Sequence, residues 1–453
     1  MDTTLISFPH LLLALTGSIV VIILLTARYK LHAFYALFIA CFVVGIGVGM
    51  PLLDILEHAK SGIGHVMKSL ALIIVLGTAL GVLLEKSGST QVMAEWILRR
   101  TGEKKAPVAM GITGFIVGLP IFCDSGYIVL SGLANSLARR TGITMAILAG
   151  ALATGLYSVH CLIPPHPGMS AAASLLGADF GKLILVGVVV AIPSSIAGFL
   201  WTRFAANRWE SNSNSLTSRD HEPVIAKRPS AGMAFAPVFI PILLIALKPF
   251  LVTQNPPESF LERTIAVGGE PAMALFIGIL LSLFNFRNGN SRSLITTSLS
   301  DAAEKAGGIL VIIGAGGAFG AILAATDPAA HFTSLTNSSS LGVLFPFLVA
   351  VVLKTAQGSS TVAVITTASL IHPLLPVLQL DSPNGILLAA LSMGAGSMMI
   401  SHANDAYFWV IAKFSGLEMK TMLRVYTVAS AVMGLTAFLA VYVLWFFLQS
   451  SLN

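Results

Sequence analysis

The sequence contains very little charge. Only 10% of its 453 residues are Asp, Glu, Lys or Arg, and the mean hydropathy is +0.87. Many apolar runs are roughly 20 residues long, which is the length that an α-helix needs to cross a bilayer. This composition excludes a soluble globular protein and predicts an all-α polytopic membrane protein whose surroundings are a lipid bilayer.

Cysteine is also scarce, with Cys41, Cys123 and Cys161 all in apolar segments. An odd number of cysteines in such segments excludes a disulfide framework. No strand precedes the glycine-rich runs, which excludes a dinucleotide-binding loop. His160 and His166 have no third ligand near them in the sequence, so we expect no metal site and no cofactor.

The positive charge is distributed over short loops. The formal net charge is +6, but a distribution between apolar runs follows the positive-inside rule and excludes a nucleic-acid-binding protein. The first run, 8–27, has no basic segment before it and no cleavage site after it, so a retained helix is expected. With the basic loops in the cytoplasm, both termini lie outside, and the predicted spans are about 8–27, 31–51, 66–84, 143–166, 183–204, 233–252, 270–286, 307–326, 385–403 and 422–448.

Two further apolar stretches, about 107–138 and about 341–376, are too long for one helix and have polar residues at their midpoints. Each begins and ends on the same side of the membrane in this topology. We therefore predict two re-entrant hairpins, which we name hairpin one and hairpin two.

The segment 207–229 is rich in Ser, Asn and charge, and it is the predicted cytoplasmic linker between two halves, 1–206 and 230–453. Each half also contains a helix that polar, helix-breaking residues interrupt, at about 143–178 and about 385–412. Broken backbone is tolerated at membrane depth only where protein buries it or it lines a wet cavity. These interruptions predict the place where a polar substrate is handled.

An internal repeat relates the two halves. Gly77 recurs as Gly316, a shift of 239 (316 minus 77), and the hairpins align at a shift of 232, from Gly126 to Gly358. The first half enters its repeat from outside and the second from inside, so the repeat is predicted to be inverted. In this architecture the substrate site lies near the midplane between broken helices.

The tip of hairpin one contains Asp124, Ser125 and Gly126. An ionisable residue at membrane depth costs about 2.5 to 3.5 kcal/mol, which makes Asp124 a functional candidate. The alternative is a solvated aspartate at a shallow tip. The returning half-helices start near Ser125 and Gly126 and near Ser359 and Ser360, and helix N-termini attract carboxylates, so the predicted substrate is an anion.

Hairpin two supplies one cation. Lys354 is the predicted partner of the substrate carboxylate, although a lysine that snorkels to the interface is the alternative. Around it lie an amide, hydroxyl groups and a glycine that permits close approach of the backbone. These predicted substrate-binding residues are Thr355, Gln357, Gly358, Ser359 and Ser360.

The interrupted helices contribute the remaining candidates. His160 and His166 flank Pro164-Pro165, and histidine titrates near neutrality, so either is a candidate proton carrier; a structural histidine that donates to a freed carbonyl is the alternative. Asn404 and Asp405 offer oxygens for a hydroxylated substrate, a proton or a sodium ion. The predicted substrate site therefore also includes His166, Asn404 and Asp405, and the proton-coupling candidates are Asp124, Asp405, His160 and His166.

Three strings carry a family resemblance: Lys354-Thr-Ala-Gln-Gly-Ser-Ser-Thr-Val-Ala363, Ser401-His-Ala-Asn-Asp-Ala-Tyr-Phe-Trp409 and Ile163-Pro-Pro-His-Pro-Gly168. They resemble the signature segments of the gluconate permease (GntP) family of sugar-acid:proton symporters. The resemblance implies uptake of a small hydroxy-carboxylate at the bacterial inner membrane, driven by the proton gradient. It also implies an ion-transporter superfamily fold: a homodimer whose hairpin-bearing transport domains slide as elevators against a scaffold.

Two departures from the family pattern bear on the substrate. The family's hairpin-one tip resembles Phe-Glu or Tyr-Glu-Val-Gly, whereas this chain has Cys123-Asp124-Ser125-Gly126, with an acid one methylene shorter. After the Asn-Asp pair the family often has Ser-Gly, whereas Ala406-Tyr407 stands here and adds bulk beside the pocket. Family members also carry D-serine, glycerate and other short polyol acids.

Import of an anion into a negative interior costs about 2.3 kcal/mol per charge for each 100 mV, so a cation must accompany it. A proton carried by Asp124 is the first choice. Sodium is the alternative, since oxygens at Thr355, Gln357 and Asn404 would suit that ion. An intramembrane enzyme that uses Asp124 with His160 or His166, and a passive anion channel, are the alternatives of other classes.

Overall fold

The computed structural model describes residues 8–209, 229–252, 259–286, 291–326, 341–402 and 405–450, and these residues form helices without any β-strand. In chain order the principal helices are α1 (Phe8–Ile23), α2 (Ala33–Gly47), α3 (Leu52–Lys86), α4 (Ser89–Thr101), α5 (Ala106–Gly118), α6 (Cys123–Thr141), α7 (Met145–Leu162), α8 (Pro167–Leu176), α9 (Phe180–Trp209), α10 (Ala231–Leu251), α11 (Phe260–Gly268), α12 (Pro271–Leu283), α13 (Ser291–Ala325), α15 (Leu344–Gln357), α16 (Ser360–Ile371), α17 (Pro383–Ser397), α18 (Ala406–Ser415), α19 (Met419–Met422) and α20 (Val428–Ser450). The prediction of an all-α membrane protein is confirmed.

Long apolar helices account for six of the ten predicted spans. Among the described residues, the helices long and apolar enough to cross a membrane are Leu52–Lys86, Met145–Leu176, Phe180–Arg208, Ala231–Lys248, Arg292–Ala325 and Met419–Phe447. The other four predicted spans correspond to the shorter helices α1, α2, α12 and α17. Of these, α12 follows α11 at a bend of 78°, and the two together form a seventh candidate span.

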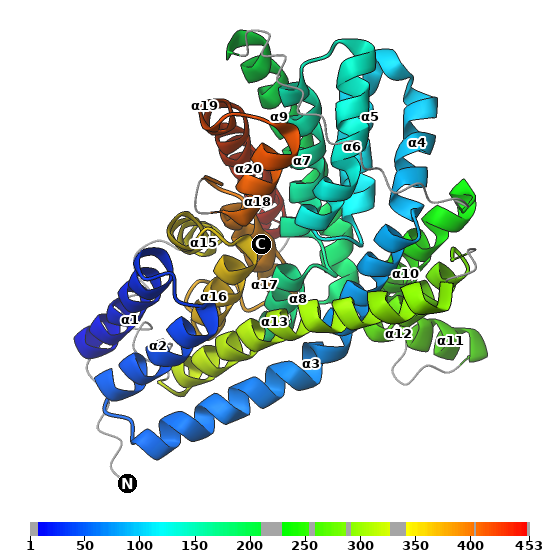
Figure 1. The fold of residues 1–453 in the computed structure, drawn as a ribbon. Coiled ribbons are helices and arrows are strands. Elements are labelled where there is room, and N and C mark those ends of the chain that lie inside the picture. Colours follow the sequence, from blue (N-terminus) through cyan, green and yellow to red (C-terminus); the bar gives the residue numbers. More distant parts are fainter. Residues whose placement is uncertain are drawn as a thin grey trace.

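The helices α3 and α13 are each 35 residues long and lie side by side across the molecule (Figure 1). A Cβ atom on Gly62 would come within 2.3 Å of the carbonyl oxygen of Gly317, so glycine is what allows this close crossing. Both helices begin well before the predicted spans 66–84 and 307–326, because their first halves are polar and hydropathy detects only the apolar second halves.

The remaining helices pack around this pair. At one end of it lie α1 and α2, at the other α10, α11 and α12, and α4 to α7 stand above it (Figure 1). The core is centred on α7, in which every residue except His160 is buried.

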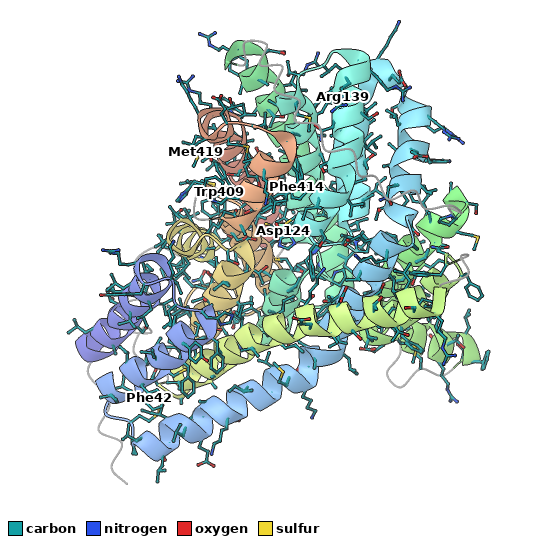
Figure 2. The ribbon with its side chains drawn as sticks, viewed as in Figure 1. Phe42, Asp124, Arg139, Trp409, Phe414 and Met419 are labelled. Atoms are coloured by element: carbon teal, nitrogen blue, oxygen red, sulfur yellow. The ribbon has the colours of Figure 1, made fainter. Side chains whose placement is uncertain are left out.

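Each predicted hairpin is a helix–turn–helix: α5 and α6 join through residues 119–122, and α15 and α16 join through Gly358 and Ser359. The predicted interrupted helices are α7 with α8 and α17 with α18. Figure 2 places Asp124, at the start of α6, near the middle of the molecule, whereas Arg139, in the last turn of α6, lies at its periphery. The re-entrant orientation of the hairpins in the membrane stays a prediction.

Helix boundaries recur at the predicted shift of 239 residues. The starts of α3 and α13 (291 minus 52), of α8 and α18 (406 minus 167) and of α9 and α19 (419 minus 180) all differ by this number. The ends of α5 and α15 also differ by 239 (357 minus 118), so the predicted shift of 232 for the hairpins is wrong.

Gly126 accordingly lies inside α6, whereas Gly358 lies in the turn after α15 with φ of 85°, and the two glycines are not equivalent. The inverted relation of the halves stays a prediction. Most of the predicted linker, residues 210–228, lies outside the described residues.

Candidate functional site

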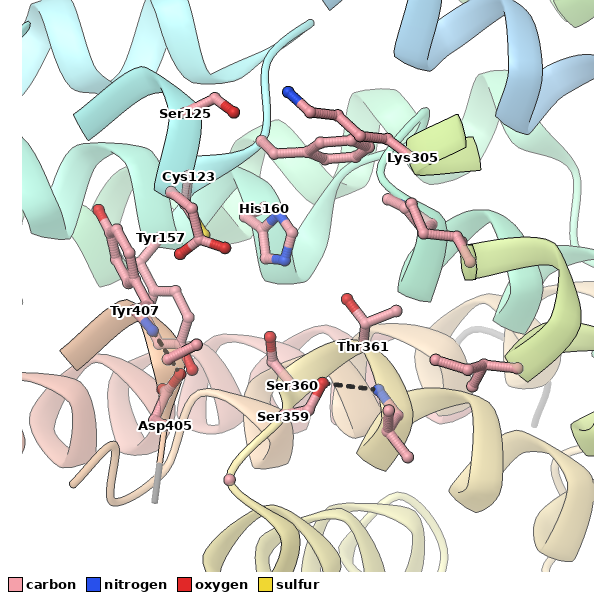
Figure 3. A pocket seen from close by; sticks show the side chains of 18 residues that line it. Cys123, Ser125, Tyr157, His160, Lys305, Ser359, Ser360, Thr361, Asp405 and Tyr407 are labelled. Atoms are coloured by element: carbon pink, nitrogen blue, oxygen red, sulfur yellow. Dashed lines mark hydrogen bonds between the residues drawn. The ribbon is translucent and has the colours of Figure 1, made fainter. Parts of the chain in front are cut away.

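The starts of four helices converge on one cavity of about 500 Å³ (Figure 3). Its wall contains residues from the N-termini of α6, α8, α16 and α18, and the last turns of α7 and one face of α13 complete it. The first amide groups of an α-helix have no partner within the helix, and the helix dipole adds partial positive charge there. A cavity built in this way favours an anion.

The start of α6 has no side-chain cap. Its N-cap residue is Phe122, whose side chain has no hydrogen-bond acceptor, and the first bond of the helix runs from the Gly126 amide to the Phe122 carbonyl. The amide groups of Cys123, Asp124 and Ser125 therefore precede the helical ladder. All three residues line the cavity.

The starts of α16 and α18 are capped by their own side chains. The Ser359 hydroxyl accepts a hydrogen bond from the Val362 amide at 3.3 Å. The Asp405 carboxylate accepts one from the Tyr407 amide at 2.9 Å. Of the two hairpin returns, the start of α6 is thus the one that lacks a cap and remains available to a ligand.

Lys354 and Asp405 form a buried ion pair beside the cavity. Lys354 is fully buried and Asp405 is 6% exposed. The lysine ammonium donates to Asp405 Oδ2 at 2.6 Å and to the carbonyl oxygen of Gly358 at 2.5 Å. Ser401 donates a further hydrogen bond to the same carboxylate oxygen at 2.5 Å. The pair fastens the turn of hairpin two to the break between α17 and α18.

Asp124 is half-buried on the cavity wall. Among the described residues, no lysine, arginine or histidine lies within ion-pair distance of its carboxylate. An unpaired carboxylate beside a site that favours anions opposes their binding while it is ionised.

The two histidines of the first break differ in their surroundings. His160 lines the cavity, and its Nδ1 atom is buried without a hydrogen-bond partner among the described residues. His166 is 2% exposed, lies behind the wall and donates from Nε2 to the carbonyl oxygen of Gly118 at 2.7 Å. His166 therefore holds the end of α5, which corresponds to the structural alternative for this residue.

The structure brings together seven of the predicted residues on the cavity wall: Asp124, Ser125, His160, Gly358, Ser359, Ser360 and Asp405. His166, Lys354, Thr355 and Gly126 are not among the residues that line the cavity. At Gly126 a Cβ atom would come within 2.8 Å of the Leu156 side chain, so this glycine serves the packing of α6 on α7. Gln357 is the last residue of α15, and Asn404 lies outside the described residues.

Sequence reasoning missed several residues of the wall. Tyr157 lines the cavity and packs against Tyr407, the residue expected beside the pocket, with their ring centroids 5.5 Å apart. Lys305 of α13 also lines the cavity, although it is distant in sequence from both hairpins. It lies beside Asp301 and Glu304 in the polar first half of α13, before the predicted span 307–326, so no signal in the sequence singled it out.

No three His, Cys, Asp or Glu side chains of the described ranges are close enough together to hold a metal ion. The polar groups of the wall are carboxylates, hydroxyls, an imidazole and an ammonium group. They suit hydrogen bonds to a hydroxylated anion.

The family model and the similar proteins agree on one family. The model of the GntP family permeases matches residues 10–447. The gluconate permease of Pseudomonas aeruginosa is 33% identical over 94% of this chain and 95% of its own length. The D-serine transporter DsdX of Escherichia coli is 32% identical over 95% of this chain and 97% of its own length. The Gnt-II system L-idonate transporter of Escherichia coli is 30% identical over 95% of this chain and 98% of its own length.

Solved structures share the fold at low sequence identity. The YdaH transporter of Alcanivorax borkumensis superimposes with a TM-score of 0.63 and 17% identity, over 92% of this chain and 98% of that one. MtrF of Neisseria gonorrhoeae, described as one of a class of antimetabolite efflux pumps, superimposes with a TM-score of 0.60 and 15% identity, over 86% of this chain and 83% of that one. At these identities the likeness concerns the fold alone.

Proposed function

The chain belongs to the GntP family of permeases, and we propose that it is a proton-coupled symporter which imports a small hydroxy-carboxylate across the bacterial inner membrane. The substrate class is a gluconate-like sugar acid or a short polyol acid. The observation that carries this proposal is the cavity of about 500 Å³ at which four helices begin. Relatives named for gluconate, D-serine and L-idonate support a substrate with a carboxylate.

The carboxylate of the substrate is proposed to bind where the main chain favours an anion, at the uncapped start of α6. The hydroxyl groups of Ser359, Ser360 and Thr361 on the opposite side of the cavity suit the substrate hydroxyls (Figure 3). Tyr407 and Ala406 limit the space beside them.

Lys354 remains our proposed partner of the substrate carboxylate, on the condition that Asp405 is protonated. Its ammonium group is held by Asp405 and by the carbonyl oxygen of Gly358. A proton on Asp405 would remove the opposing charge and release the ammonium group toward the Gly358–Ser359 turn, which lines the cavity. Binding of the anion at Lys354 and protonation of Asp405 would then favour each other.

Asp124 is the first candidate for the coupling proton. Its carboxylate lies on the cavity wall without an ion-pair partner among the described residues. A proton there removes the repulsion between Asp124 and the substrate carboxylate. Anion and proton then cross together, which avoids the cost of about 2.3 kcal/mol per 100 mV for the anion alone.

The molecular arrangement proposed for transport is that of a homodimer with both termini outside. In it the hairpins and interrupted helices move as an elevator domain, and the long α3–α13 pair belongs to the scaffold. The close crossing at Gly62 and Gly317 supports a rigid pair, and the fold shared with YdaH supports the general architecture.

Uptake into proteoliposomes tests the function. A panel of radiolabelled sugar acids and hydroxy acids is presented under an imposed pH gradient, a sodium gradient or neither. We expect accumulation above equilibrium of at least one hydroxy acid with the pH gradient, and its abolition by a protonophore. Accumulation with the sodium gradient alone would show that sodium, and not a proton, is the coupling ion. Uptake that stops at equal concentrations on both sides would indicate a passive channel. Conversion of the substrate to a product in detergent would indicate an enzyme.

A further inference from the structure

One charged residue of the cavity wall comes from the long helix pair and not from a hairpin or an interrupted helix. Among the described residues that line the cavity, the charged ones are Asp124, Asp405 and Lys305. Asp405 is engaged by Lys354, whereas no carboxylate of the described ranges lies within ion-pair distance of Lys305. Lys305 therefore brings a cation to the cavity that no described side chain neutralises by contact.

Lys305 lies at the mouth of the cavity, by which we mean the end formed by α13. Lys305, Ile309 and Ile312 all line the cavity and follow the spacing of one helix face. Lys305 is exposed, and so are the neighbouring Gly307 and Gly308. Gly308 lies one turn from Lys305 on the same side of α13, and a Cβ atom there would meet nothing within 4 Å.

Lys305 lies on the polar first half of the long helix α13. It belongs to the helix pair that crosses closely at Gly62 and Gly317. The carboxylate of Glu85 on α3 lies close enough to interact electrostatically with Lys305 and Lys86, though not as an ion pair with Lys305. An exposed ammonium group without an ion-pair partner among the described residues is available to an incoming anion.

Figure 3 shows Lys305 on the same side of the cavity as Ser125, with Ser359, Ser360 and Thr361 on the opposite side. Ser125 belongs to the uncapped first turn of α6. The cation and the uncapped first turn of α6 thus lie on one side of the cavity, and Asp405 lies on the other side (Figure 3). Each of the two features alone attracts a carboxylate, and together they define a site.

We propose that Lys305 and the start of α6 form an outer anion site, which binds the substrate carboxylate while Lys354 is still paired with Asp405. This inference rests on the proposed function and adds to it a second binding position and a specificity-determining residue. The outer site requires a negative charge on the ligand. A hydroxylated ligand without that charge gains nothing from Lys305.

Equilibrium binding to the purified full-length protein in detergent tests the proposal, with D-gluconate and its neutral amide, D-gluconamide, as probes. Lys305→Gln should weaken gluconate binding about three- to tenfold, the range for a partly exposed charge-assisted contact. The affinity for gluconamide should stay unchanged. Lys305→Arg should restore most of the gluconate affinity, and the dependence of that affinity on ionic strength should be smaller in Lys305→Gln than in the wild type.

Lys86→Gln is the matched control, because Lys86 also interacts with Glu85 but does not line the cavity. It should leave both affinities unchanged. The outer site is refuted if Lys305→Gln binds gluconate with the affinity of the wild type. It is also refuted if Lys305→Gln loses as much affinity for gluconamide as for gluconate, or if Lys86→Gln weakens gluconate binding as much as Lys305→Gln does. If the wild type binds and transports no sugar acid at all, the proposed function fails; if it does both and Lys305→Gln matches it, only the outer site fails.

Discussion

Removal of one partner from the Lys354–Asp405 pair should destabilise the protein far more than removal of both. Lys354 is fully buried, Asp405 is 6% exposed, and their charged atoms lie 2.6 Å apart. Lys354→Met leaves a buried carboxylate, and Asp405→Asn leaves a buried ammonium group. Either change should cost about 3 to 5 kcal/mol of unfolding free energy, because the remaining charge has no counterion.

The double variant Lys354→Met/Asp405→Asn contains neither charge. Independent effects would sum to about 6 to 10 kcal/mol, whereas a true pair predicts that the double variant costs no more than one single variant. The coupling energy should therefore be at least about 3 kcal/mol. The double-mutant cycle is measured by unfolding the wild type, the two single variants and the double variant in one detergent at one pH, with tryptophan fluorescence as the signal.

Ser401→Ala provides a graded comparison in the same site, because Ser401 donates to the same carboxylate oxygen at 2.5 Å. It should cost about 1.5 to 3 kcal/mol, as expected for a hydrogen bond to a charged group. Additivity of the Lys354 and Asp405 variants to within about 0.5 kcal/mol would refute the pairing. In transport, Lys354→Gln should raise the apparent KM or abolish uptake without loss of expression, and unchanged affinity would show that Lys354 does not anchor the anion.

Three further predictions follow from the cavity and the helix crossing. Asp124→Asn should abolish accumulation driven by a pH gradient but retain exchange between equal internal and external pools, since exchange moves no net proton; continued accumulation would place the proton at Asp405 or a histidine. Cys123 lines the cavity, so a membrane-permeant thiol reagent should label it in a Cys41→Ser/Cys161→Ser background, and saturating substrate should slow the labelling; a rate that ignores substrate would contradict this position of the site. Gly62→Ala should cost about 1 to 3 kcal/mol of stability because its Cβ meets the Gly317 carbonyl, whereas Gly64→Ala, on the same helix with no neighbour within 4 Å, should gain up to about 1 kcal/mol; equal effects in thermal unfolding would be inconsistent with the crossing.

Features that depend on local sequence were predictable. Hydropathy located helices at all ten predicted spans, and the polar residues at the midpoints of long apolar stretches located both hairpin turns. Asp124, Ser359 and Asp405 could be assigned to the cavity because each lies at the start of a half-helix, where backbone amides and membrane depth both make polar residues informative.

Features that depend on packing between distant segments were not predictable. Lys305 reaches the cavity only because α13 passes across the hairpin turns. Gly126 was predicted to belong to the substrate site, but its lack of a side chain accommodates Leu156 of α7. Lys354 was expected to face the substrate, and its partner in this structure, Asp405, lies on a different helix.

The uncapped start of α6 also bears on how such a carrier can evolve. Every residue type except proline supplies a peptide N–H group, so substitutions at Cys123, Asp124 or Ser125 by other non-proline residues would leave this part of the proposed anion site intact. Substitutions elsewhere on the wall, such as at Thr361 and Tyr407, would then change which hydroxylated acid fits while the amide groups at the start of α6 remain. In the proposed mode of binding, a change of substrate within the hydroxy acids therefore needs no change in the groups that attract the carboxylate.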